Sequence, residues 1–123
     1  MKLAGPVFAM AVMATTLGAR AQTDTFFDGE DLNITCQDYL AAPGRRATIS
    51  AGRCLGYVEG VIDEALDTAD PARKICFPKN VPSTTLAESV ANYLANNPQN
   101  RQYTAASLVV RALQEAYPCP LKT

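Results

Sequence analysis

Three acidic residues, Glu59, Asp63 and Asp67, have the side-chain type and spacing that acid–base chemistry would need. They recur every four residues, so in a helix each lies one turn from the next. A pair of this kind can supply a general acid and a general base if burial separates the two pKa values. A calcium site and a solvated acidic helix face are the alternatives, and we favour the solvated face.

The rest of the composition argues against catalysis. The sequence contains no histidine, which excludes serine triads, cysteine–histidine dyads and histidine metal sites. Its four cysteines lack the close spacing of a zinc site, and in a small exported chain an even number predicts two disulfides. They are Cys36, Cys54, Cys76 and Cys119. We therefore expect no enzymatic activity, metal or cofactor.

Gly52, Gly56 and Gly60 follow one another at four-residue spacing in a predicted helix. Each glycine costs roughly 1 kcal/mol relative to alanine inside a helix, so we expect a close backbone approach on this face. The pattern resembles membrane helix dimers, but the acidic residues nearby exclude a bilayer location. We count these glycines and Tyr57 as helix-packing residues. Either another helix of the chain or a partner, such as a second copy, fills the face.

Residues 1–21 have the features of a cleaved export signal. Lys2 precedes an apolar run, and Ala19-Arg20-Ala21 fits the small-x-small cleavage pattern. The run is shorter than the roughly 20 residues that span a bilayer. We expect cleavage after Ala21 and a single mature domain, residues 22–123, outside the membrane. This mature chain has fewer basic than acidic residues and no basic run, which argues against nucleic-acid binding.

The remaining pattern predicts an all-α, compact bundle of four to five helices stapled by two disulfides. Asp28 and Thr104 are expected caps, and Leu32, Cys36 and Leu40 form one apolar stripe. The second helix contributes apolar positions that include Ile49 and Leu66. The expected helices cover residues 29–41, 47–66, 83 or 84 to 96, and 105–117.

The helix order suggests a disulfide pairing. An antiparallel hairpin centred near residues 44–46 places Cys36 and Cys54 at similar heights, within reach of a disulfide. Antiparallel packing of the last two helices brings Cys76 and Cys119 to one end of the domain. We prefer these two pairs.

Several motifs resemble a known family. Cys54-x-Gly56-Tyr57-Val58-x-Gly60-Val61-x-Asp63 resembles the C-x-G-Y-I-x-G-V-x-D segment of the Tai/Rap immunity proteins, which protect bacteria against peptidoglycan amidases delivered by type VI secretion. Similar matches follow in order at Cys76-Phe-Pro78, Pro98-x-x-Arg101 and Ala116-Tyr117-Pro118-Cys119. The resemblance covers residues 28–120. It implies a helical periplasmic protein, often a homodimer, that binds an amidase and blocks its catalytic cleft.

The connection before the last helix is the expected partner-binding surface, because it is polar and contains residue types enriched in binding hot spots. Family histidines and an acid are replaced here, so the partner would differ. An ordinary solvated connection is the alternative, with Arg101 structural. The predicted contact residues are Asn97, Gln99, Asn100, Arg101, Gln102 and Tyr103.

A different function remains compatible with the sequence. Small helical proteins with disulfides also act as periplasmic acid-stress chaperones, which expose apolar helix faces at low pH. We keep this as the alternative to inhibition of an amidase.

Overall fold

The computed structural model describes residues 3–5, 25–41 and 47–121 of the chain. The predicted export signal and the turn at residues 42–46 lie almost entirely outside these residues. The regular elements of the described part are helices, as the sequence predicted, and one isolated β-bridge joins Asp28 and Thr104. Its elements are α1 (Gly29–Cys36), η1 (Gln37–Tyr39), α2 (Ile49–Asp67), η3 (Pro71–Arg73), α3 (Ser83–Asn96), η4 (Pro98–Asn100) and α4 (Ala105–Ala116).

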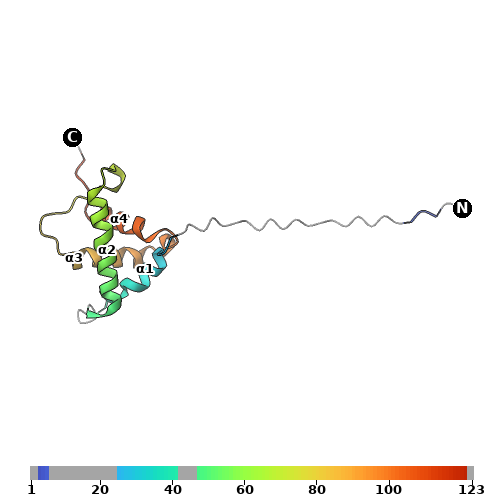
Figure 1. Cartoon of the computed structure of the whole chain (residues 1–123), viewed down its shortest axis with the longest axis horizontal. Helices are drawn as coiled ribbons and strands as arrows, with labels where there is room; N and C mark the ends of the chain where they lie inside the picture. Colours follow the sequence, from blue (N-terminus) through green and yellow to red (C-terminus); the bar gives the residue numbers. More distant parts are fainter. Residues whose placement is uncertain (1–2, 6–24, 42–46, 122–123) are drawn as a thin grey trace.

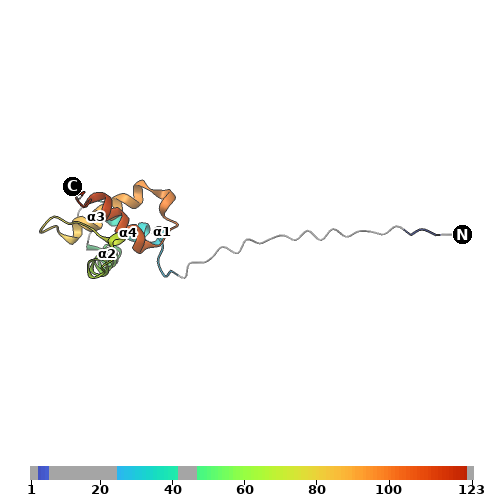
Figure 2. The ribbon, with the colours of Figure 1, turned by 90° about the horizontal axis from the view of Figure 1, so that it is seen from above.

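The long helix α2 forms one side of the domain. Figure 1 shows it crossing in front of the other helices, and Figure 2 shows it nearly end-on along one side of the body. The core lies between α2 and the layer formed by α1, α3 and α4, and aliphatic side chains from all four helices are fully buried there. They include Leu32, Val58, Val90, Leu94, Leu108, Val109 and Leu113. One face of α2 is therefore in the core and the opposite face is outside.

The first helix is shorter than predicted. Asp28 caps α1 as expected, because its Oδ1 accepts a hydrogen bond from the Asp31 backbone at 2.9 Å. The α-helix ends at Cys36, however, and the tighter η1 follows it. A 3₁₀ turn advances by three residues rather than 3.6, so the buried position shifts from Leu40, which is 44% exposed, to Tyr39, which is 3% exposed.

Two apolar positions assigned to the core side of the second helix are also wrong. Ile49 is 86% exposed and Leu66 is 61% exposed. Thr48 caps α2 by accepting a hydrogen bond from the Ala51 backbone at 3.0 Å, so Ile49 is the first helical residue. Ile49 lies at the end of the helix, where no described element covers its side chain.

Both predicted disulfides are present, Cys36–Cys54 with a Cα–Cα distance of 5.0 Å and Cys76–Cys119 with 4.9 Å. The first joins α1 to α2 inside the core. The second joins the connector before α3 to the segment after α4, so it closes the α3–α4 hairpin at its open end. In the described part of the chain, no helix is long and apolar enough to cross a membrane.

Candidate partner-binding surfaces

The turn between α3 and α4 is held in place by side chains that bind the end of α3. Nδ2 of Asn97 donates to the Tyr93 carbonyl at 2.8 Å, and Nε of Arg101 donates to the Leu94 carbonyl at 2.8 Å. The last carbonyls of a helix have no partner within the helix. Asn97 and Arg101 therefore satisfy groups that α3 itself leaves open, and they fix where the turn begins.

The same turn is also bound to the start of α1. The Gly29 amide donates to the Tyr103 carbonyl at 2.9 Å, and the Glu30 amide donates to the Arg101 carbonyl at 3.1 Å. A Cβ on Gly29 would lie 2.7 Å from both Cα and O of Arg101 and 2.4 Å from Cδ1 of Leu108. Glycine is therefore required at position 29, because only a residue without a side chain allows this backbone approach.

The six predicted contact residues thus fall into two groups. Asn97, Asn100 and Arg101 hold the turn together, with Nδ2 of Asn100 donating to the Tyr93 hydroxyl at 3.0 Å. Gln99 and Gln102 are exposed, and Tyr103 is 50% exposed. The backbone of the turn is thus held in place, and the turn presents the side-chain amides of Gln99 and Gln102 and the phenol of Tyr103 to solvent.

The glycines of α2 do not pack against another helix of the chain. At Gly52, Gly56 and Gly60, an added Cβ would meet no atom within 4 Å, and all three residues are exposed. The alternative in which a helix of the same chain fills this face is therefore wrong for the described residues. Tyr57, the fourth residue of that prediction, has its ring 5.1 Å from that of Phe27, which precedes α1 and lies outside the helices.

Two adjoining hollows follow this face of α2, and Tyr57 lines both. One, of about 280 Å³, is bounded by Phe26, Phe27 and Arg53. The other, of about 520 Å³, is lined by Gly56, Tyr57, Gly60, Val61, Glu64, Arg73 and Ala106. Burial raises the pKa of the Tyr57 phenol, and a hydrogen bond with the Ala106 backbone opposes this rise, so the hollows contain a neutral phenol at neutral pH.

The acidic residues of α2 lie in solvent. Glu59, Asp63 and Asp67 are all exposed, so none of them has the buried environment that acid–base chemistry by such a pair would require. Within the part of the chain that the structure describes, no three His, Cys, Asp or Glu residues are grouped to hold a metal ion. The solvated-face interpretation is the one that fits these positions.

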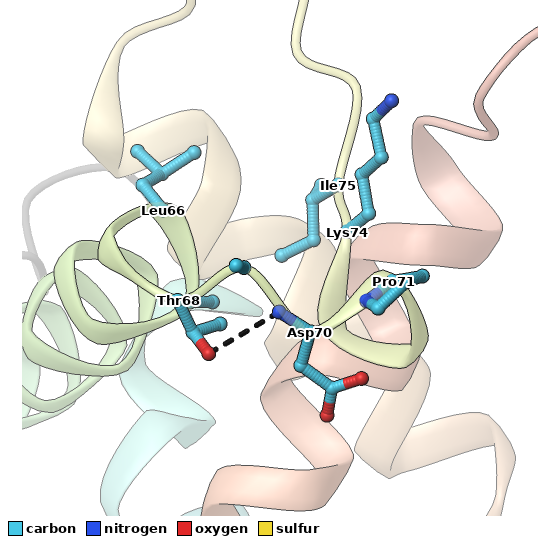
Figure 3. Close-up of a pocket in the computed structure, with 8 residues that line it drawn as sticks. Leu66, Thr68, Asp70, Pro71, Lys74 and Ile75 are labelled. Carbon is cyan, nitrogen blue, oxygen red and sulfur yellow. Dashed lines mark hydrogen bonds between the residues drawn. The ribbon is translucent and has the colours of Figure 1, made fainter.

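A further hollow, of about 530 Å³, lies where α2 ends and the chain turns into η3. Figure 3 shows its two charged residues: the Asp70 carboxylate and the Lys74 amine point in opposite directions. The Asp70 backbone amide donates to Oγ1 of Thr68 at 3.4 Å, the dashed line of Figure 3. Because these charges do not converge, the hollow offers no polar constellation for a ligand.

Two residues of these surfaces escaped the sequence interpretation. Phe26 is fully exposed beside the α2 hollows, and Gly29 makes the backbone contact described above. A glycine directly after a capping aspartate was the available signal for Gly29, since glycine is disfavoured inside helices. Phe26 had no such signal in the sequence.

Comparison with known proteins gave one family. The model of the family described as Rap1a immunity proteins matches residues 28–119, the span from the α1 cap to the last disulfide cysteine. No curated protein and no solved structure matches the chain.

Proposed function

The chain belongs to the Rap1a immunity protein family, and from this we propose that it inhibits a peptidoglycan amidase delivered by type VI secretion, by binding the enzyme and occluding its active-site cleft. Members of an immunity protein family act by binding, so this protein is not an enzyme. Its target is a cognate amidase effector. The amidase would be met in the periplasm, an oxidising compartment that matches the two disulfides. In this proposal residues 1–21 direct export and residues 22–123 are the working domain.

The observation that carries the occlusion mechanism is the fixed turn between α3 and α4. Arg101 and Asn97 bind the end of α3, and the backbone of Gly29 and Glu30 holds the turn from the other side. A surface that is already ordered loses little conformational entropy on binding, which favours tight association. Gln99, Gln102 and Tyr103 are then the side chains that contact the enzyme. We also propose that the protein works as a homodimer, which would present two such turns.

The proposal is tested with a type VI amidase as the target enzyme, sought first among the products of the genes next to this one. The mature chain is titrated against that enzyme, and release of cleaved peptides from purified peptidoglycan is measured together with binding by calorimetry. We expect stoichiometric inhibition. An enzyme that binds nothing and remains fully active with excess mature chain would overturn the proposal.

Variants locate the contact surface in the same assay. Tyr103→Ala combined with Gln102→Ala removes two exposed groups without touching the hydrogen bonds that hold the turn. We expect at least a tenfold weaker complex, since truncation of a hot-spot aromatic typically costs more than 1 kcal/mol. Lys79→Ala is the matched control, because Lys79 is exposed in the connector near the opposite end of α3. Equal affinity of all variants would place the contact elsewhere.

A further inference from the structure

The first turn of α1 and the turn between α3 and α4 form one continuous surface. Two backbone hydrogen bonds join them, from the Gly29 amide to the Tyr103 carbonyl at 2.9 Å and from the Glu30 amide to the Arg101 carbonyl at 3.1 Å. The backbone approach at Gly29 leaves no room for a Cβ, so the two segments are in direct contact. A side chain on the outer face of α1 is therefore held at a fixed position relative to the exposed residues of the turn.

Glu30 presents a carboxylate on this surface. Its side chain is 54% exposed, and its Oε2 lies 3.5 Å from Nη1 of Arg101. Nε of the same guanidinium is bound to the end of α3, so the base that orients the Glu30 side chain is itself fixed. Asp31 is used within its own helix, because its Oδ2 accepts a hydrogen bond from the Asp28 backbone at 3.4 Å. A carboxylate can accept about four hydrogen bonds, which leaves Glu30 with capacity for a partner.

An exposed apolar side chain lies next to this carboxylate. Ile34 follows Glu30 by four residues, so it is one turn further along the same side of α1, and it is 59% exposed. Tyr103 on the adjoining turn is 50% exposed. The surface thus combines an aliphatic group and an aromatic ring with one oriented charge. Apolar groups bordered by polar ones are typical of protein–protein contacts.

The charge of this surface selects the kind of partner. In α1 and in residues 97–104, Arg101 is the only basic residue, and its guanidinium is engaged by the end of α3 and by Glu30. A complementary partner therefore carries a base, because opposite potentials face each other across specific contacts. The fixed turn, which we assign to the amidase contact, continues directly into this surface, so the amidase is the partner that reaches it.

We propose that Glu30 and Ile34 extend the inhibitory contact beyond the turn, and that Glu30 is a specificity-determining residue. Its carboxylate pairs with a lysine or arginine at the rim of the amidase cleft, and Ile34 covers an apolar patch beside that base. The chain then favours amidases that carry a base at this position. This inference rests on the proposed function, since the amidase is the occupant.

A charge at the edge of a contact acts mainly on association, because opposite charges steer two proteins together. Glu30→Gln should lower the association rate at low ionic strength at least about threefold and weaken its salt dependence, and Glu30→Lys should lower the rate at least about tenfold. Glu115→Gln is the matched control. Glu115 is also exposed and paired, 3.9 Å from Arg111 in the last turn of α4, so its variant removes the same charge away from the surface and should leave the rate unchanged.

An apolar contact acts mainly on dissociation, where most differences in affinity arise. Ile34→Gln should dissociate at least about fivefold faster, with an association rate close to that of the natural chain. Leu66→Gln is the matched control, because Leu66 is 61% exposed at the other end of the domain, in the last turn of α2. Thermal unfolding of every variant checks that the fold is intact.

Surface plasmon resonance of the mature chain on the amidase used to test the proposed function, at low and high salt, measures both rates. An amidase that is inhibited equally by the natural chain and by the Glu30 and Ile34 variants, with unchanged rates, would overturn this inference and leave the proposed function intact. An amidase that the natural chain does not bind would overturn both. Variants that weaken self-association in sedimentation experiments, and not amidase binding, would assign the surface to a contact between copies and also overturn it.

Discussion

Nε of Arg101 donates to the Leu94 carbonyl at 2.8 Å, which places a guanidinium at the C-terminal end of α3. A cation at this end also interacts favourably with the helix dipole. Arg101 therefore has a structural role in the turn.

Replacing Arg101 tests this assignment. We expect Arg101→Ala to lower the free energy of unfolding by about 1–3 kcal/mol, because a charged donor to a helix carbonyl is lost. Urea denaturation of the mature chain measures the change. Gln102→Ala, at the exposed neighbouring position, should change stability by less than about 0.5 kcal/mol. Equal stability of the two variants would contradict a structural role for Arg101.

Gly29 and Gly52 should respond oppositely to the same substitution. Gly29→Ala places a Cβ 2.7 Å from the Arg101 backbone, and such overpacking typically destabilises by about 1–3 kcal/mol. Gly52→Ala meets nothing within 4 Å and should stabilise α2 by about 0.5–1 kcal/mol, because alanine favours the helix. Thermal unfolding of both variants checks the prediction, which fails if Gly29→Ala is neutral.

The two disulfides should differ in their resistance to reductant. Cys36 and Cys54 are fully buried, whereas Cys76 and Cys119 are partly exposed. Because reduction requires a thiolate to reach a sulfur atom, we expect Cys76–Cys119 to be reduced first in the native protein. Mass spectrometry after timed alkylation identifies the pair. Earlier alkylation of Cys36 and Cys54 would contradict this order.

Loss of each disulfide should also cost stability. Chain-entropy estimates give about 3 kcal/mol for closing a loop of 18 residues and about 4 kcal/mol for one of 43. On chain entropy alone, the double variant Cys76→Ala with Cys119→Ala should therefore lose at least as much free energy of unfolding as Cys36→Ala with Cys54→Ala. Removing the buried Cys36–Cys54 pair also leaves a cavity, which adds to the cost of that variant. Urea denaturation compares the two, and an unchanged midpoint in either would contradict the estimate.

Stability should fall at high pH because of Tyr57. Burial raises the pKa of its phenol above 10.0, so the folded protein holds this proton more tightly than the unfolded chain. The resulting stabilisation is fully present below pH 10 and is lost as pH rises through the raised pKa. Unfolding experiments between about pH 9 and 12 should show a smaller loss in Tyr57→Phe. Parallel profiles over the whole range would exclude Tyr57 as the cause.

Local rules explain which parts of this fold could be predicted. The expected bounds of the last two helices agree closely with α3 and α4, and Thr104 caps α4 as expected, with its Oγ1 accepting from the Ser107 backbone at 3.3 Å. The cysteine pairs followed from helix order alone. By contrast, Tyr39 replaces Leu40 in the core because the α-helix ends at Cys36 and a 3₁₀ turn follows. The spacing of apolar residues does not reveal this change of helix type.

The candidate surfaces depended on long-range contacts and were harder to predict. Polarity predicted a turn between α3 and α4, but it could not separate Arg101, which binds the end of α3, from Gln102, which faces solvent. The glycine spacing of α2 predicted a close approach without naming the partner. The packing of the other helices decides whether this face is covered by the same chain or left exposed, and the sequence of α2 alone does not contain that information.

The Cys76–Cys119 bond makes the α3–α4 hairpin part of a closed covalent ring. A protease that cuts one peptide bond within this ring leaves both products joined through sulfur, and the buried contacts of both helices can persist. A single nick there would separate into fragments on a gel only after reduction. Where extracytoplasmic proteases are present, the ring therefore keeps the two products of a single cut together, and the domain can remain folded.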